Sequence, residues 1–384
     1  MKKADSTESI TIEKVKALGK EKSEENFDRL LELYNSELAI PIKREVVSSI
    51  GRQKNKERIY QFISERAFEK TYMEFIYQMF RTTLYHSKDE RFRELSERIM
   101  EHYDNEVLRK MKYYYENKRK KPKPPEHLIS KPTLLVGDSE STLSRINDGE
   151  VQLIFTSPPY YNAREYSDYT SYQVYLDKMK NVLRECSRVL EDGRFIIINV
   201  SPVITKRPGR EFESVRYPIH FDFHSILQQT GFYFVDEIIW IKPESSVKDR
   251  VGGYRQTRKP LSYKPNCITE SLMVYRKTAP FLLDENIKQY DFVPSEEEKN
   301  EPFDTSNCWY IAPKSNRNHP AVFPEELCRK VLKYYSYAGD VVLDPFAGSG
   351  TFGKVAQKME RIPVLCELNE QYVKGLGDEG YDVI

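Results

Sequence analysis

The stretch VVLDPFAGSGTFGKVAQKMERIPVLCEL, residues 341 to 368, decides the fold class of this 384-residue chain. Its apolar run up to Asp344 predicts a buried strand, and the glycines at 348 and 350 predict a tight turn. The residues that follow predict a helix and a second strand that ends at Glu367. Strands and helices alternate in this way from about residue 132 onward. Between about residues 243 and 318 the alternation is lost, and we expect a polar, basic and irregular stretch there. We therefore expect an α/β domain with a doubly wound, Rossmann-like sheet.

Two features of this stretch indicate a nucleoside ligand. Gly348 and Gly350 allow the backbone to approach a ligand more closely than a Cβ atom would permit. Glu367 lies 17 residues beyond Gly350, where a carboxylate at a strand end can accept hydrogen bonds from ribose hydroxyls. Residues 348–354 also resemble a phosphate-binding loop, but Val355 stands where that loop needs Ser or Thr to hold Mg²⁺. We therefore expect an adenosine-containing cofactor.

A second stretch, VQLIFTSPPYYNAREY at residues 151 to 166, places two prolines directly after a buried strand. Prolines lack an N–H, so a rigid turn at Pro158 and Pro159 presents carbonyl acceptors. Ser157 adds a hydroxyl and Tyr160 adds a flat aromatic face. Together these groups suit a planar ligand with an exocyclic amino group, which they would orient for attack on an electrophile. The stretch contains no cysteine, so it offers no nucleophile for a covalent route through a ring carbon.

Residues 1–120 differ in texture from the rest of the chain. Apolar residues recur there at helical spacing, and no proline occurs between Pro41 and Pro122. We expect an all-helical domain of five to seven short helices that serves as a scaffold or contacts partners, with DNA tracking as an alternative. Residues 40–63 resemble a single HEAT-type repeat. A basic, proline-rich run then predicts a linker at residues 121–131.

Composition limits the classes of partner. The chain has 60 basic and 59 acidic residues, so any binding to nucleic acid must come from a local basic face. Residues 242–277 provide one, with nine basic against three acidic side chains interleaved with Tyr254 and Tyr263. From this region we predict five DNA contacts: Lys248, Arg250, Arg255, Arg258 and Lys259.

The sequence shows no sign of a membrane segment, a secretory signal, disulfides or a metal site. No apolar run is long enough for a membrane helix, and the first residues lack the apolar core of a secretory signal. Five scattered cysteines predict reduced, buried thiols in a cytoplasmic protein. The histidines show no metal-binding spacing, so we expect no metal.

Residues 130–375 resemble the amino-group DNA methyltransferases that use S-adenosylmethionine. The sequence TSPPY is similar to that family's catalytic motif, and DPFAGSGT is similar to its cofactor loop. HPAVFPEEL, residues 319–327, resembles the segment that precedes this loop. Because the catalytic motif comes before the cofactor loop, the order is that of the permuted β group, whose target recognition region lies between them. The resemblance implies a catalytic half at residues 132–243, a recognition region at 244–310 and a cofactor-binding half at 311–384.

The resemblance also implies roles for individual residues. Ser157, Pro158, Pro159 and Tyr160 would hold and activate a base flipped out of double-stranded DNA. The implied cofactor-binding residues are Asp138, Thr156, His319, Pro320, Asp344, Phe346, Gly348, Gly350, Thr351 and Glu367. Among them Asp138 would accept a hydrogen bond from the adenine amino group, and Glu367 would bind the ribose.

The identity of the target base depends mainly on one position. Serine before Pro-Pro-Tyr is typical of members that methylate cytosine N4, whereas Asp or Asn is typical of adenine N6 enzymes. We therefore expect an N4-cytosine methyltransferase of a restriction-modification or phage-defence system, with a cognate defence protein as a partner. Adenine N6 remains the alternative. More distant alternatives are methylation of RNA or a protein amide, and a module that binds S-adenosylmethionine and DNA without turnover.

Overall fold

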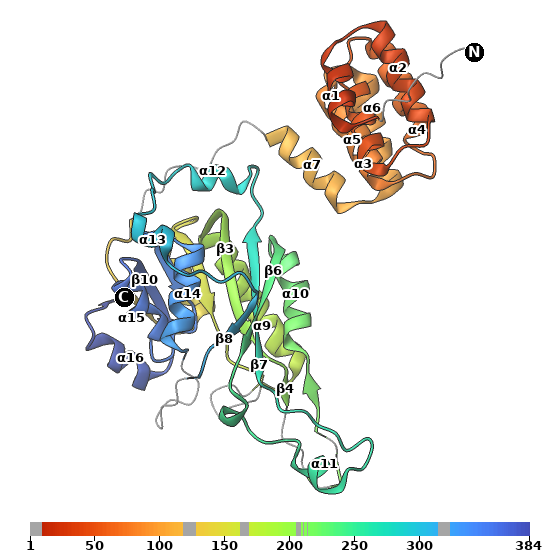
Figure 1. Ribbon diagram of the computed structural model, residues 1–384. Coiled ribbons are helices and arrows are strands. Elements are labelled where there is room, and N and C mark those ends of the chain that lie inside the picture. The colour runs from red at the N-terminus through yellow and green to blue at the C-terminus, as the bar shows by residue number, and fades with distance from the viewer. Residues whose placement is uncertain are drawn as a thin grey trace. The chain divides into compact units, whose positions relative to one another are not determined.

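The computed structural model describes residues 10–117, 128–161, 169–204, 209, 211–212, 214–313 and 323–384. The chain divides into two compact units, Met1–Lys120 and Lys121–Ile384 (Figure 1). Each unit has its own apolar core.

The first unit is all-helical over its described residues, as predicted. Its helices are α1 (Ile12–Lys20), α2 (Glu24–Asn35), α3 (Ile40–Ile50), α4 (Lys56–Arg66), α5 (Met73–Tyr85), α6 (Glu90–Tyr103) and α7 (Glu106–Asn117). Polar residues begin several of them: the side chains of Ser23, Asn55 and Asp89 accept hydrogen bonds from backbone N–H groups of the first turn. The segment that resembles a HEAT repeat forms α3 and α4, with Pro41 in the first turn of α3.

The second unit is built on a nine-stranded mixed sheet in the order β11-β1-β10-β9-β2-β3-β7-β6-β8. Its strands are β1 (Thr133–Val136), β2 (Val151–Thr156), β3 (Leu190–Val200), β6 (Phe232–Ile241), β7 (Thr269–Lys277), β8 (Cys308–Tyr310), β9 (Val341–Asp344), β10 (Ile362–Glu367) and β11 (Asp382–Val383). The first six strands of this order run parallel, and β7 pairs antiparallel with both β3 and β6. A separate two-stranded sheet joins β4 (Val203–Ile204) to β5 (Arg216–Tyr217).

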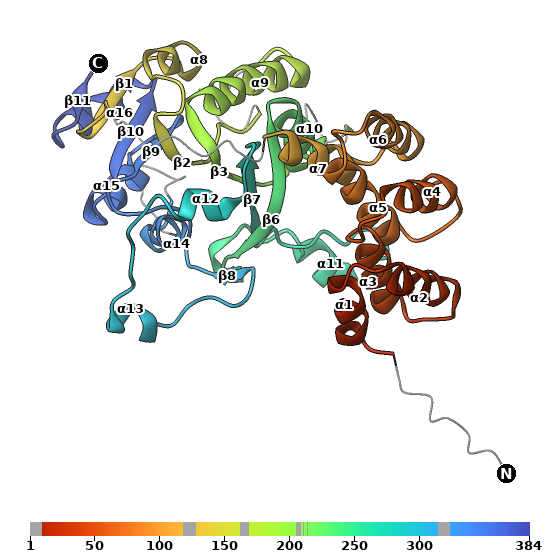
Figure 2. The same cartoon turned by 90° about the horizontal axis from the view of Figure 1, so that it is seen from above.

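Helices cover both faces of the large sheet, as expected for a doubly wound fold (Figure 2). The helices of this unit are α8 (Ser139–Thr142), α9 (Tyr172–Val189), α10 (Ile219–Gln229), α11 (Gly252–Thr257), α12 (Leu283–Ile287), α13 (Glu296–Asn300), α14 (Glu325–Tyr335), α15 (Thr351–Lys358) and α16 (Glu370–Gly377), with short 3-10 turns at Leu143–Arg145 and Glu244–Ser246. Alternation along β2 separates the two layers, because Ile154 packs on the α9 and α10 side whereas Leu153 and Phe155 pack on the α14 and α15 side. Both faces are buried, which explains the continuous apolar run of this strand.

One expectation about the region between residues 243 and 318 was wrong. We expected an irregular stretch throughout, but residues 269–277 form β7, an internal strand of the large sheet. The side chains of this strand show little alternation between apolar and polar residues, because both faces of the strand are covered by other parts of the chain. The irregular part is therefore split, and residues 242–268 form an arm that extends from the sheet and carries α11 (Figure 1).

The cysteine prediction holds for three of the five thiols. All five are free, but only Cys186, Cys328 and Cys366 are buried. Cys267 lies exposed on the arm, and Cys308 is partly exposed at the start of the edge strand β8. Over the described ranges, no helix has the length and apolarity to cross a membrane, and no cluster of three metal-ligating side chains occurs.

Candidate active site

The polar residues predicted from the sequence gather at one edge of the sheet. After β9 the chain continues through α15 to β10 on one side, and after β2 it continues through α9 to β3 on the other. Where the connections that follow two neighbouring parallel strands run to opposite sides, a crevice opens at the carboxyl ends of those strands. Asp344 ends β9, Thr156 ends β2 and Glu367 ends β10, while Asp138 follows β1. The fold therefore brings the two motifs together although almost two hundred residues separate them.

Asp344 joins these two motifs directly. The Thr156 hydroxyl donates to Asp344 Oδ1 at 2.6 Å, and the backbone N–H of Phe346 donates to the same oxygen at 3.0 Å. Asp344 is buried, and this burial raises the pKa of its carboxyl to about 7. Both of these hydrogen bonds come from the protein itself, so the geometry favours a role in holding the loop to the catalytic strand.

Three glycines shape the loop after β9 and the start of α15, and a side chain would be unfavourable at each of them for a different reason. Gly348 and Gly350 have φ angles of +55° and +72°. A Cβ at Gly348 would meet no heavy atom within 4 Å, so this side of the loop is open, whereas a Cβ at Gly350 would lie 2.3 Å from Leu376 Cδ2. At Gly353 a Cβ would lie 2.4 Å from the Tyr381 hydroxyl oxygen, so this glycine lets α15 pack closely on its neighbours. Our sequence analysis missed Gly353, although the G-x-G-x-x-G spacing from residue 348 was present.

Glu367 lies beside the open face of this loop. Its carboxylate accepts the N–H of Gly348 at 2.7 Å through Oε2 and the N–H of Asn369 at 2.7 Å through Oε1. Partial burial raises its pKa, while these N–H groups favour the charged form. A carboxylate offers about four acceptor positions, so each oxygen can accept one more hydrogen bond. The open space at Gly348 and these acceptors fit the ribose of an adenosine cofactor.

The structure places Asp138 at the start of α8. Its Oδ1 accepts the backbone N–H of Glu140 at 2.9 Å, and Lys178 Nζ lies 2.7 Å from both of its oxygens. Lys178 also contacts Glu140 Oε2 at 2.7 Å. Lys178 was not identified from the sequence because it lies in α9, forty residues away. The role of Asp138 toward an adenine remains a prediction.

The Pro-Pro turn is anchored at both ends. The Ser157 hydroxyl donates to the backbone oxygen of Asn199 on β3 at 3.1 Å, and Pro158 is buried. Tyr160 is partly exposed, while Tyr161 is buried with its ring edge-on to Tyr172 and Tyr217, at centroid distances of 5.3 and 4.8 Å. Tyr161 packs the end of the turn into the core, and our sequence analysis missed it although it stands next to the motif.

A chain of polar contacts supports the turn from behind. Asn199 Nδ2 donates to Glu270 Oε2 at 2.5 Å, and Lys242 pairs with the other oxygen of Glu270. Glu270 and Lys242 are largely shielded from solvent. Lys242 therefore belongs to the support of Ser157 and not to the free basic face. Asn199 and Glu270 could not be found from the sequence because they lie 42 and 113 residues from Ser157.

Phenylalanine rings bring the third motif to the same place. Phe155 of the catalytic strand stacks on Phe323 at a centroid distance of 4.6 Å and lies edge-on to Phe352 of α15 at 5.4 Å. Phe323 belongs to the HPAVFP segment, so all three motifs share one cluster. The predicted cofactor contacts His319 and Pro320 fall outside the described residues.

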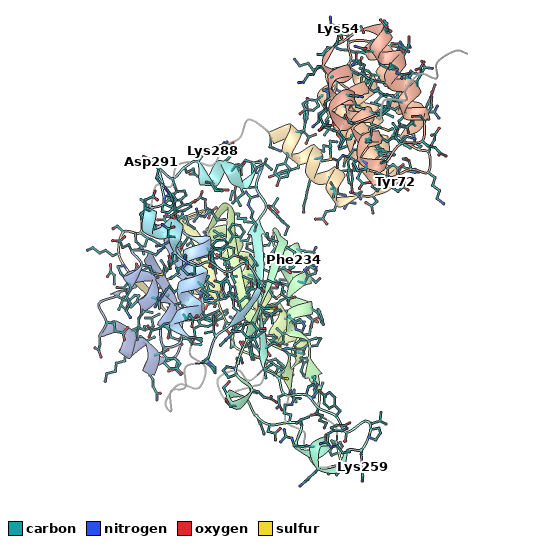
Figure 3. All side chains as sticks on the ribbon, viewed as in Figure 1. Lys54, Tyr72, Phe234, Lys259, Lys288 and Asp291 are labelled. Atoms are coloured by element: carbon teal, nitrogen blue, oxygen red, sulfur yellow. The ribbon has the colours of Figure 1, made fainter. Side chains whose placement is uncertain are left out.

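The predicted DNA contacts lie on the arm. Lys248, Arg258 and Lys259 have no carboxylate partner among the described residues, and Arg255 lies 3.3 Å from the exposed Asp249. The two remaining charges at the carboxyl end of the basic run do not belong to this face: Arg276 and Lys277 lie on β7 and bond to the backbone oxygens of Gly193 and Leu190. Figure 3 shows Lys259 at the far end of the arm.

Tyr254 and Tyr263 have a structural role on this arm. Their rings pack edge-on at a centroid distance of 5.4 Å and join its two sides. Asn266 adds a second brace, because its amide accepts the N–H of Arg250 at 2.6 Å and donates to Glu244 at 2.7 Å. The arm therefore holds its cations on an ordered frame.

Comparison with known proteins identifies the class to which this site belongs. The family model of N6/N4 DNA methylases matches residues 151–377, which is more than half of the chain. The chain belongs to this DNA methylase family, whose members act on exocyclic amino groups. S-adenosylmethionine is the cofactor of this class, which confirms the cofactor prediction.

Two curated relatives illustrate the extent of the similarity. The type II beta methyltransferase M.BslI of Bacillus sp. (strain NEB-606) is 30% identical over 256 residues, which cover 63% of this chain and 26% of that protein. The type II methyltransferase M.Cfr9I of Citrobacter freundii is 30% identical over 275 residues, covering 63% of this chain and 85% of that protein. The matched part of this chain thus spans about a quarter of the Bacillus protein.

A solved structure confirms the fold. The PvuII DNA methyltransferase, described as cytosine-N4-specific, aligns with a TM-score of 0.50 and 19% identity over 68% of this chain and 91% of that one. This similarity confirms the predicted Rossmann-like architecture of the second unit.

Proposed function

We propose that this protein transfers a methyl group from S-adenosylmethionine to the exocyclic N4 of cytosine in double-stranded DNA. Adenine N6 is the alternative target. The observation that carries the proposal is the orientation of Ser157, whose hydroxyl proton is directed to the Asn199 carbonyl. The Ser157 oxygen therefore offers lone pairs, not a proton, to a ligand in the crevice.

The residues around the crevice fit the cofactor that the family uses. Glu367 would accept the ribose hydroxyls, and the open side of Gly348 would admit the cofactor against the backbone. Phe346 and Thr351 flank this loop, and Asp344 with Thr156 holds it to the catalytic strand. The bound cofactor would supply an electrophilic methyl group.

The chain's own groups would orient the amine for this methyl group. Ser157 Oγ and the Pro158 carbonyl can each accept an N–H of the target amino group, which directs the nitrogen lone pair away from the base plane. The same acceptors stabilise the positive charge that develops on nitrogen as the new bond forms. Tyr160 would stack on the base after it has left the duplex. These steps need neither a covalent base intermediate nor a charged side chain at position 157.

The serine at position 157 favours cytosine over adenine as the target base. A neutral hydroxyl provides one acceptor with its proton already engaged, and serine is the residue that the family resemblance associates with N4.

The names of the relatives M.BslI and M.Cfr9I specify type II methyltransferases, which supports a role in a restriction-modification system with a cognate nuclease. Such an enzyme would act on DNA in the cytoplasm.

Mapping of modified bases in a host that expresses the protein tests the proposal. We expect N4-methylcytosine at one recurring sequence, and its absence from a host that expresses Ser157→Ala. N6-methyladenine without N4-methylcytosine would establish the alternative target. Transfer of labelled methyl groups to purified duplex containing the mapped sequence separates an enzyme from a binding module, because a module would bind cofactor and DNA without labelling either strand.

A further inference from the structure

The tip of the arm is a tight turn with an unusual residue at its apex. The backbone N–H of Ser262 donates to the Lys259 oxygen at 3.3 Å, and the Ser262 hydroxyl donates to the same oxygen at 2.6 Å. Pro260 occupies the second position of this turn, and Leu261 occupies the third with a φ of +68°. A positive φ at the third position is typical of a type II turn, where glycine or asparagine is preferred.

Leucine is unfavourable at this position in two ways. Its branched side chain strains a left-handed backbone that glycine would adopt freely. Its side chain is also fully exposed, at 101% of the reference area, so it gains nothing from burial within the chain. Folding therefore does not account for Leu261, whereas burial against a partner would.

The charges around the apex indicate which partner. Lys248, Arg258, Lys259 and Lys264 surround the turn in sequence, and none has a carboxylate partner within the described ranges. A partner must therefore combine dense negative charge with an apolar interior that a leucine can enter. Duplex DNA has this chemistry, because phosphates line its surface and stacked bases form its interior.

We infer that Leu261 is an apolar wedge that enters the substrate duplex between base pairs while the neighbouring cations bind phosphates. This inference rests on the proposed action on double-stranded DNA. Removal of a base from the stack leaves adjacent bases without a neighbour, and an inserted apolar side chain lowers that cost. The edge-on pair Tyr254–Tyr263 keeps the turn ordered, so the side chain is presented before binding.

Binding of a fluorescein-labelled duplex that contains the mapped sequence tests this wedge. Leu261→Gly removes the side chain and the backbone strain together, so its melting temperature should equal or exceed that of the wild type. We expect its affinity for the duplex to fall about tenfold, with an unchanged dependence of log K on log salt concentration. A 2-aminopurine placed beside the target base should lose most of its fluorescence increase.

Two control variants separate the wedge from general effects. Leu282→Ala removes another exposed leucine, before α12, and should bind as the wild type does. Lys259→Ala should reduce the salt slope by about 0.9, as expected for one lost phosphate contact. Wild-type affinity and fluorescence for Leu261→Gly would overturn the inference. Self-association of the wild type without DNA that Leu261→Gly abolishes would also overturn it, by assigning the leucine to a second copy.

Failure of the wedge and failure of the proposed activity give different results. A wild-type protein that methylates adenine N6 in the mapped sequence, and whose 2-aminopurine fluorescence increase is lost in Leu261→Gly, would remove the proposed N4-cytosine activity and keep the wedge. Wild-type transfer with unaltered binding by Leu261→Gly would remove the wedge and keep the activity.

Discussion

At the carboxyl edge of the sheet, polar side chains are held by other parts of the chain, whereas the cationic side chains at the tip of the arm have no carboxylate partner among the described residues. Thr156 bonds to Asp344, Ser157 bonds to the Asn199 carbonyl and Glu367 holds the glycine loop. On the arm, Lys259 has no carboxylate partner among the described residues and Leu261 is fully exposed. The crevice is thus organised before any ligand binds, which suits the orientation of reacting groups. The arm carries groups whose interactions must come from a partner, which suits recognition.

The largest effect is expected from Gly350→Ala in the crevice. The new Cβ would strain a backbone with φ of +72° and would displace Leu376, which lies 2.3 Å from its position. We expect the free energy of unfolding to fall by about 2–4 kcal/mol and cofactor binding to weaken strongly. Thermal unfolding and calorimetric titration with S-adenosylmethionine measure these effects.

Gly339→Ala is the matched control for this substitution. Gly339 has a φ of +85° with no heavy atom within 4 Å of the Cβ position, so only the conformational part of about 1 kcal/mol should appear. Equal losses in the two variants would show that packing under the glycine loop does not matter.

Tyr160→Ala should separate catalysis from cofactor binding. The loss of base stacking should lower methyl transfer about ten- to hundredfold and leave the cofactor dissociation constant unchanged. Labelled methyl transfer and cofactor titration give the two values, and Tyr160→Phe should retain most of the activity. A parallel loss of cofactor binding would contradict the assignment of Tyr160 to the base site and not to the cofactor site.

Asp344→Asn should change the pH dependence of stability. The folded-state pKa of about 7 lies above the value of about 3.9 for an unfolded aspartate, so the folded protein retains a proton that the unfolded chain releases in this interval. Wild-type stability should therefore fall as pH rises from about 4 to 7, with a slope approaching about 1.4 kcal/mol per pH unit.

Asparagine can keep both hydrogen bonds to Oδ1, from Thr156 and Phe346, without titrating. The variant should show a flatter profile, with a smaller fall from Glu367, whose pKa burial also raises. Denaturant unfolding at several pH values measures the difference. Parallel profiles would show that Asp344 is ionised throughout.

The smallest effect is expected on the arm, from Lys264→Ala. Lys264 is exposed and has no carboxylate partner in the part of the chain that the structure describes, so it should contribute little to folding and the melting temperature should not change. Affinity for duplex DNA should fall a few-fold, with a salt slope lower by about 0.9. Anisotropy titrations across about 50–200 mM salt give this slope. A large loss of stability would show that the arm is organised by its charges, as the crevice is.

The sequence by itself determined most of the segments that form strands and helices, although not β7, and it indicated the chemistry that they carry. Periodicity predicted the helical first unit and the alternating second one, because burial of one or both faces leaves a repeat in the chain. The motifs at residues 156–160 and 344–351 indicated a methyltransferase through their resemblance to a known family. Their glycines and prolines impose a local backbone geometry that does not depend on distant residues.

Only the tertiary structure decided how these segments support one another. The Thr156–Asp344 bond joins residues 188 positions apart, and the Ser157–Asn199–Glu270 chain crosses three strands. The position of β7 inside the sheet and the pairing of Lys178 with Asp138 likewise depend on the packed layers. A hydrogen bond between distant residues leaves no periodic pattern in a single sequence, because its geometry exists only after the strands have paired and their helices have packed.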